Sequence, residues 1–187
     1  QAGVTFHQIG PVEDGEAKES LRKILAEESK DSPHPLWLVL IGHGTFDRKL
    51  AKFNLIGPDL EASELAKWLK DFERPLVIIN CSSSSAPFIK ALSGKGRSVV
   101  TATRSGYEQN FSHLGGYLAT AIADPSADLD KDGQVSLLEA WLIAARRTAD
   151  FYKQEGRLAT EHSLLDDNGD GKGTQSDWFR GLQVTKK

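Results

Sequence analysis

The sequence predicts an α/β fold in which a doubly wound, mostly parallel sheet is flanked by helices. Three nearly continuous apolar runs support this prediction, at residues 35–42, 75–81 and 97–103. Such runs are typical of parallel strands that are buried on both faces. Segments with helical spacing lie between them, and this alternation favours crossover helices. The other expected elements are a weaker strand over 4–9, helices over 15–29, 61–72, 86–92 and 113–123, and a long helix after residue 136.

The composition is that of an ordinary globular domain. The chain has 187 residues, 39% of them hydrophobic, and a formal net charge of −3. This charge leaves no basic surface for nucleic acid, and no apolar run is long enough to span a membrane. We expect a single domain over residues 1–187, with an acidic region at 124–178 built into it. Because the chain opens abruptly for this fold class, an upstream strand or presequence is a further expectation. The state of assembly stays open.

Two chemically reactive side chains follow predicted strands. His43 lies between two glycines after the first run, and Cys81 ends the second run, just before the serines at 82–85. In open parallel sheets, ligands bind beyond the carboxyl ends of the strands. A thiolate there can attack a carbonyl while an imidazole protonates the leaving amine. The backbone N–H groups of Gly44 and Cys81 are candidate donors to the oxyanion.

The stretches IGHGTFD and IINCSSSS, with KFNLIGPDL between them, resemble the caspase–legumain clan of cysteine peptidases, and most closely its bacterial legumain-like members. The resemblance covers residues 15–173 and implies a caspase-like fold. It also implies a cysteine endopeptidase that works through a thioester acyl-enzyme. Cys81 would be the nucleophile, His43 the general acid and base, and Gly44 an oxyanion donor. The substrate would be a peptide or protein.

The chain departs from this clan in two places. Ile79 stands two residues before the cysteine, where plant and animal legumains carry an acidic residue, so specificity for Asn is not expected. About fifteen residues separate Cys81 from the next run, which is too few for the cleavable linker of caspases. We therefore expect an intact single chain.

By the same resemblance, the strand after the cysteine and the loop beyond it line the substrate pocket. An inward Glu108 would suit a basic side chain or an amide, whereas an inward Arg104 would suit an acidic one. Alternatively, these two residues form a solvated pair. The full set of candidate pocket residues is Thr101, Thr103, Arg104, Ser105 and Glu108.

The segment from 128 to 139, DLDKDGQVSLLE, matches the calcium-binding loop of EF-hands. Asp128, Asp130 and Asp132 occupy positions one, three and five of the loop. Gln134 would bind through its backbone carbonyl, and Glu139 through both carboxylate oxygens. The alternative is an acidic turn that caps the following helix at Ser136.

A second segment from 166 to 177, DDNGDGKGTQSD, is a poorer copy of the same pattern. Asp166, Asn168 and Asp170 fit the ligand positions. Gly173 replaces the usual apolar residue, and Asp177 replaces the final Glu with a shorter carboxylate. The DDNGDG pattern also occurs in the bacterial legumain-like proteins that this chain resembles.

Calcium at these loops is expected to be structural, and the sequence implies no organic cofactor. Extracellular calcium modules bind with dissociation constants of about 10⁻⁴–10⁻³ M. The loops therefore favour a periplasmic or secreted protein, with a cytoplasmic one as the alternative.

Several other interpretations remain open. The chain can be a catalytically inactive, calcium-binding scaffold of the same fold that acts through protein partners; this predicts a buried or unreactive Cys81. An esterase with one of the serines at 82–85 as nucleophile lacks the expected Gly-x-Ser-x-Gly elbow. His113 and His162 are rival bases, although neither ends a strand. Transpeptidation is an alternative fate of an acyl-enzyme.

Overall fold

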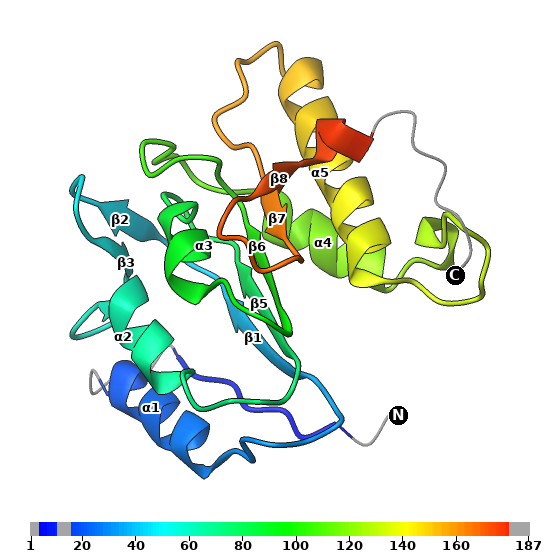
Figure 1. Ribbon diagram of the computed structural model, residues 1–187. Coiled ribbons are helices and arrows are strands. Elements are labelled where there is room, and N and C mark those ends of the chain that lie inside the picture. Colours follow the sequence, from blue (N-terminus) through cyan, green and yellow to red (C-terminus); the bar gives the residue numbers. More distant parts are fainter. Residues whose placement is uncertain (1–3, 11–15, 180–187) are drawn as a thin grey trace.

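The computed structural model describes residues 4–10 and 16–179, and its centre is a five-stranded sheet (Figure 1). Its strands in spatial order are β1 (Leu36–Leu40), β5 (Leu76–Asn80), β6 (Arg97–Thr101), β7 (Leu164–Asp166) and β8 (Thr174–Gln175). Strands β1, β5 and β6 are parallel, whereas β7 and β8 pair in the antiparallel sense. The α/β class and all three long predicted strands are confirmed, and the sheet is mixed.

Helices cover both faces of this sheet (Figure 1). Neighbouring residues of a strand point to opposite faces, so Ile78 joins the core on one side and Ile79 the core on the other. The first core contains the apolar stripes of the three early helices, and the second those of the two late ones. The early helices are α1 (Ala17–Glu27), α2 (Ala62–Trp68) and α3 (Pro87–Leu92), and the late ones are α4 (Leu114–Ile122) and α5 (Leu137–Gln154).

A second, small sheet was not predicted from the sequence. It consists of β2 (Gly44–Phe46), β3 (Ala51–Phe53) and β4 (Leu60–Glu61), paired antiparallel. These strands are too short to show a period of two residues, so no sequence pattern marks them. The small sheet begins at Gly44, directly after His43, and therefore fixes the backbone of one candidate catalytic loop.

The predicted strand over residues 4–9 is wrong. Residues 4–10 have no regular secondary structure, and the side chains of Val4 and Phe6 are exposed. An apolar alternation becomes a strand only where a neighbouring strand pairs with it, and no described residue pairs with this segment. The described chain also contains two short 3₁₀ segments, η1 (Pro125–Ala127) and η2 (Ser176–Phe179).

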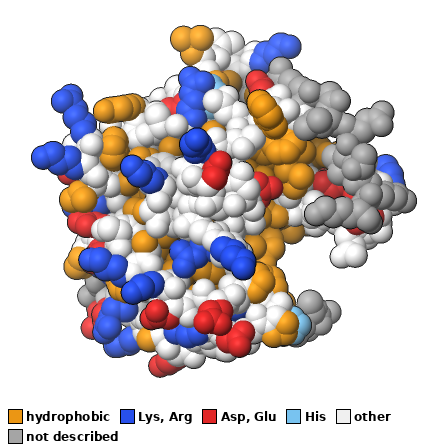
Figure 2. All heavy atoms as spheres, viewed as in Figure 1, with side chains coloured by type: hydrophobic (Ala, Val, Ile, Leu, Met, Phe, Trp, Pro, Cys, Tyr) orange, Lys and Arg blue, Asp and Glu red, His pale blue; other side chains and the backbone are white. Residues whose placement is uncertain are grey.

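The surface combines charged and apolar areas. Figure 2 shows hydrophobic side chains gathered in a band near the middle of one face, with Lys and Arg side chains scattered to its left. Among the described residues, no helix has both the length and the apolar character needed to cross a bilayer.

Candidate functional site

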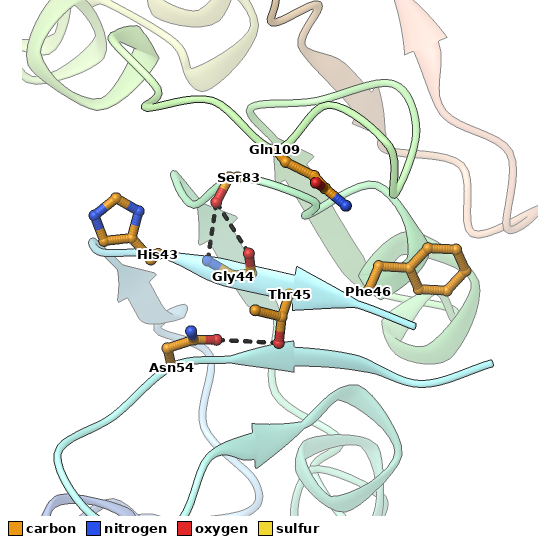
Figure 3. Close-up of a pocket in the computed structure, with 7 residues that line it drawn as sticks. All are labelled: His43, Gly44, Thr45, Phe46, Asn54, Ser83 and Gln109. Carbon is orange, nitrogen blue, oxygen red and sulfur yellow. Dashed lines mark hydrogen bonds between the residues drawn. The ribbon is translucent and has the colours of Figure 1, made fainter. Parts of the chain in front are cut away.

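The His-Gly loop and the cysteine loop lie side by side, as the sequence predicts. The Oγ of Ser83 accepts a hydrogen bond from the Gly44 N–H at 3.1 Å and donates one to the Gly44 carbonyl at 3.0 Å (Figure 3). A Cβ on Gly44 would stand 2.3 Å from the Ser83 carbonyl oxygen, so only glycine permits this approach. The two loops are thus joined at the carboxyl edge of the sheet.

A pocket of about 410 Å³ opens beside this junction. Figure 3 shows the His43 ring at one end and Phe46 at the other. A hydrogen bond of 3.3 Å from the Thr45 hydroxyl to the Asn54 side chain orders one part of the pocket. None of the residues that line it is Asp, Glu, Lys or Arg, so the pocket suits neutral polar groups. The lining residues are His43, Gly44, Thr45, Phe46, Asn54, Ser83 and Gln109.

Cys81 does not line this pocket. Only 5% of the residue is exposed, and it belongs to the core under α4 and α5. Its side chain lies close against α4, because a Cβ on Gly115 would stand 3.2 Å from Sγ. The thiol makes no hydrogen bond with His43 within the described part of the chain, and the His43 side chain is exposed. The structure therefore does not place an accessible thiol beside the histidine.

The electrostatic surroundings keep this thiol protonated. Burial raises the pKa of Cys81 to about 12, and the negative charge of Glu161 adds to the increase. No helix start lies directly at the cysteine to lower this pKa, because the serines form a non-helical turn and α3 begins at Pro87, close to the predicted start at residue 86. A thiol with so high a pKa is a poor nucleophile near neutral pH.

Neither expected oxyanion donor is free. The Cys81 N–H donates to the Leu40 carbonyl at 2.8 Å and so extends the pairing of β1 with β5. The Gly44 N–H is taken by Ser83. An oxyanion hole needs donors that point at the substrate oxygen, and this conformation offers neither.

The four serines after Cys81 are fully buried and connect the loops around them. Ser82 donates to the Asn80 side chain at 2.7 Å, and Ser83 binds Gly44. The Ser85 hydroxyl accepts hydrogen bonds from the backbone N–H groups of residues 102 and 103. Ser84 is the exception, because its hydroxyl has no hydrogen-bond partner among the described residues. The serine run is therefore an internal hydrogen-bonding element, not a row of nucleophiles.

The residues predicted to line a substrate pocket have other partners. Thr101 and Thr103 are buried, and Thr103 shares a hydrogen bond with Ser85. Glu108 accepts from the Arg104 backbone N–H at 2.8 Å and makes an ion pair with the Arg104 side chain. The Ser105 hydroxyl accepts a hydrogen bond from the N–H of residue 107. None of these side chains lines the pocket beside His43.

The two rival histidines are held in structural contacts. His162 Nδ1 lies 2.5 Å from a carboxylate oxygen of Glu108, which fastens the loop after β6 to the segment before β7. The His113 ring packs on Phe151, with ring centroids 4.3 Å apart. Phe111 stands between His113 and His43, at 5.2 and 6.4 Å from their ring centroids.

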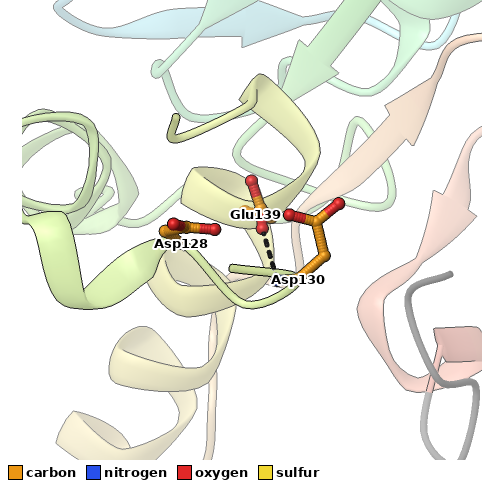
Figure 4. A group of neighbouring side chains, drawn as sticks. All are labelled: Asp128, Asp130 and Glu139. Atoms are coloured by element: carbon orange, nitrogen blue, oxygen red, sulfur yellow. Dashed lines mark hydrogen bonds between the residues drawn. The ribbon is translucent and has the colours of Figure 1, made fainter. Parts of the chain in front are cut away.

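The first acidic loop brings three carboxylates together. Oxygens of Asp128, Asp130 and Glu139 lie within 4.8 Å of one another, from the loop before α5 and its first turn (Figure 4). This group can hold a metal ion. Asp132 is exposed and is not part of it. The predicted backbone ligand, Gln134, donates its N–H to Asp132 at 2.9 Å.

Glu139 has a second role in starting α5. Its carboxylate accepts from the Ser136 N–H at 2.8 Å while the Ser136 hydroxyl caps the Glu139 N–H. Burial alone would favour the neutral acid, but hydrogen bonds from Ser136, Asp130 and Leu129 lower the pKa overall. The Glu139 carboxylate is thus held as an anion inside the molecule, and an anionic carboxylate is a suitable ligand for a cation.

The second acidic loop repeats the backbone pattern of the first. Asp166 accepts from the N–H five residues on, at 3.2 Å, as Asp128 does at 2.9 Å. Asn168 and Asp170 each accept from the N–H two residues on, as their counterparts in the first loop do. Asp177 does not join a metal-binding group among the described residues. Only the first loop therefore has a converged set of carboxylates.

Sequence reasoning missed Glu161, whose negative charge adds to the effect of burial in raising the pKa of Cys81. This buried carboxylate accepts from the backbone N–H groups of His113 and Leu114, at 2.8 and 3.3 Å, and so caps α4. It stands eighty residues after the cysteine in a segment without helical or strand periodicity. No sequence signal links the two positions.

Comparison with known proteins does not place the chain in a family, because no family model and no curated protein matches it.

Proposed function

We propose that this chain is a calcium-binding domain of caspase-like fold in which Cys81 is a structural residue. It acts by binding protein partners, and calcium stabilises the loop before α5. The observation that carries this proposal is the convergence of Asp128, Asp130 and Glu139 within 4.8 Å. Oxygen ligands in a flexible loop are the preferred environment of Ca²⁺, since Mg²⁺ demands a tighter octahedral shell.

The environment of the cysteine supports the same proposal. A catalytic thiol needs an accessible sulfur, a lowered pKa and a base within reach. Cys81 is buried, its pKa is raised to about 12, and it is absent from the pocket that contains His43. The scaffold interpretation of the sequence predicts a thiol of this kind.

Calorimetric titration of chelator-treated protein with CaCl₂ tests the proposal. We expect binding by the wild type, and for Glu139→Gln an affinity lower by at least about tenfold, since the variant loses a charged bidentate ligand. Glu155→Gln is the matched control, because it makes the same charge change at an exposed position beyond α5. No binding by the wild type, or an equal loss in both variants, would refute the calcium site.

A second candidate function is the cysteine peptidase. The observation in its favour is the hydrogen-bonded junction between Gly44 and Ser83, which joins the two loops that such an enzyme needs. This function requires a conformation in which the thiol leaves the core and reaches the His43 pocket. Calcium-loaded protein would then hydrolyse members of a peptide library, and Cys81→Ala would abolish the turnover.

A further inference from the structure

A second pocket, of about 260 Å³, lies between the loop after β6, the C-terminal end of α5 and the loop that follows α5 (Figure 1). Four aromatic rings line it, those of Phe111, His113, Phe151 and Tyr152. Neighbouring ring centroids are 4.3–6.0 Å apart, so the rings form one connected cluster. The aromatic pocket, as we call it, thus presents ring surface from both a loop and a helix.

Part of this apolar lining faces solvent. Phe111 is 64% exposed, and Leu158, which also lines the pocket, is 91% exposed. Exposed apolar residues that cluster around a cavity are typical of a binding surface. The Tyr152 hydroxyl already bonds Glu161 at 3.3 Å, so Tyr152 offers its ring and not its hydroxyl to a ligand. The pocket therefore accepts an apolar group.

Arg157 adds a positive charge to the lining, and its guanidinium has no ion pair or hydrogen bond with any described residue. Apart from Arg48, which lines neither pocket, the other described arginines each have a carboxylate or carbonyl partner. No Asp or Glu lines the aromatic pocket, and the buried Glu161 is taken up by Ser112 and His113. An unpaired guanidinium favours an anion, and a carboxylate matches its geometry.

The size of the pocket limits what can fill it. A volume of about 260 Å³ is below the range of about 300–1,000 Å³ that is typical of small-molecule sites. The lining requires an apolar group and a carboxylate within this small space. The last residue of a polypeptide carries both on one α-carbon, whereas an internal Asp or Glu has its carboxylate in place of an apolar side chain. A C-terminal residue with an aromatic or large aliphatic side chain is therefore the matching ligand.

The loop after β6 connects this pocket to the one beside His43. Gln109 lines the pocket beside His43, and the next two residues, Asn110 and Phe111, line the aromatic pocket. The centroid of the Phe111 ring lies 6.4 Å from that of His43 and 5.2 Å from that of His113. The neutral polar lining beside His43 suits the backbone amides of the residues that precede a chain end. A polypeptide, unlike a free carboxylic acid, can occupy both pockets.

We propose that the aromatic pocket binds the C-terminal residue of a partner polypeptide. The apolar side chain of that residue packs on the rings of Phe111 and Phe151, and its carboxylate pairs with Arg157. The preceding residues run towards the pocket beside His43. Aromatic residues and Arg are the side chains that most often dominate the affinity of protein interfaces. This inference rests on the proposed function as a domain that binds protein partners, but it does not require calcium.

NMR titration of ¹⁵N-labelled protein with short peptides tests the proposal. The probes are acetyl-Ala-Ala-Ala-Phe with a free carboxylate, the same peptide as its C-terminal amide, and acetyl-Ala-Ala-Ala-Ala with a free carboxylate. We expect the first peptide to shift the backbone amide signals of Asn110, Phe111 and Leu158. The amide should bind at least about tenfold more weakly, because it has no charge to pair with Arg157. The Ala-terminated peptide should also bind more weakly, since it has no large side chain to bury on the rings.

Two variants assign the contacts. Arg157→Gln should weaken binding of the free carboxylate to the level of the amide and leave binding of the amide unchanged. Arg146→Gln is the matched control, because it makes the same charge change at an exposed side chain of α5 that pairs with Asp150, and it should bind like the wild type. Phe111→Ala should reduce the preference for Phe over Ala at the end of the peptide. Dispersed NMR spectra show that each variant is folded.

Several results would overturn the proposal. Equal affinities for the carboxylate and the amide would do so, as would equal losses in Arg157→Gln and Arg146→Gln. Acetyl-phenylalanine that binds as tightly as the tetrapeptide would assign the pocket to small carboxylic acids instead. Absence of peptide binding by protein that binds calcium overturns this inference alone, whereas peptide binding by protein that fails the calcium titration supports it and refutes only the calcium site.

Discussion

Ser83 is the side chain that joins the two candidate catalytic loops. We predict that Ser83→Ala lowers the free energy of unfolding by about 1–3 kcal/mol, because the buried Gly44 N–H loses its partner. The neighbouring Ser84→Ala is the control, since the buried Ser84 hydroxyl makes no hydrogen bond within the described part of the chain. It should be close to neutral. Urea unfolding of both variants measures the difference, and equal losses would contradict this role of Ser83.

Because of Cys81, the free energy of unfolding depends on pH in the alkaline range. The folded thiol stays neutral up to a pKa of about 12, whereas in the unfolded chain it ionises near its ordinary value of 9.0. Its contribution to stability is therefore complete below pH 9 and is lost as the pH rises towards 12. The slope is about 1.4 kcal/mol per pH unit for one group.

The difference in unfolding free energy between wild type and Cys81→Ala isolates this contribution from that of other alkaline groups. We expect the difference to shrink between pH 9 and pH 11 in denaturant titrations. A difference that is constant with pH would mean that the thiol has the same pKa in the folded and the unfolded protein, and would contradict this prediction.

At the residue scale, the sequence predicts where Cys81 and His43 lie along the chain but not which way the thiol points. Position follows from the ends of apolar runs, and both loops do meet at one edge of the sheet. Orientation depends on distant parts of the chain, because Gly115 of α4, more than thirty residues away, lies against the cysteine side chain. Contacts of this kind carry no local sequence pattern.

At the scale of elements, α5 is the helix that calcium should stabilise. Glu139 belongs both to the carboxylate group and to the first turn of this helix. We predict that adding calcium slows amide hydrogen exchange at residues 137–140, since binding holds the carboxylate and with it the helix start. Helix α1 lies apart from the loop and serves as the internal control. Equal changes in α1 and α5, or none in α5, would contradict a local site.

The long strands were predictable because each contains a nearly continuous apolar run. Burial on both faces holds for most of β5, whereas β1 leaves Trp37 and Val39 about half exposed on one face. The short strands were not predictable. Strand β7 has three residues and β4 has two, too few for any period to show. The segment over 4–9 shows the opposite error, because its apolar residues alternate but find no partner strand. Whether such a segment becomes a strand depends on its pairing with residues that are distant in the sequence.

On the scale of the whole molecule, the sheet separates two regions of different character. The loops that follow β1 and β5 carry the pocket with His43, while the face under α4 and α5 encloses the thiol. Cys81 can reach solvent only if the packing against α4 opens. Exposure of the thiol therefore reports on opening of this core, not on a local rearrangement of one loop.

Alkylation of Cys81 by iodoacetamide between pH 4 and 9, on calcium-loaded wild type and His43→Ala, tests the central claim most directly. The account predicts slow labelling that shows no thiol ionisation across this pH range, because the ordinary thiol pKa is 9.0 and burial raises that of Cys81, and the rate is the same in both proteins. Mild denaturant should accelerate it in both. Fast labelling by a thiolate that forms well below the ordinary thiol pKa, lost in His43→Ala, would contradict the account and establish a catalytic pair.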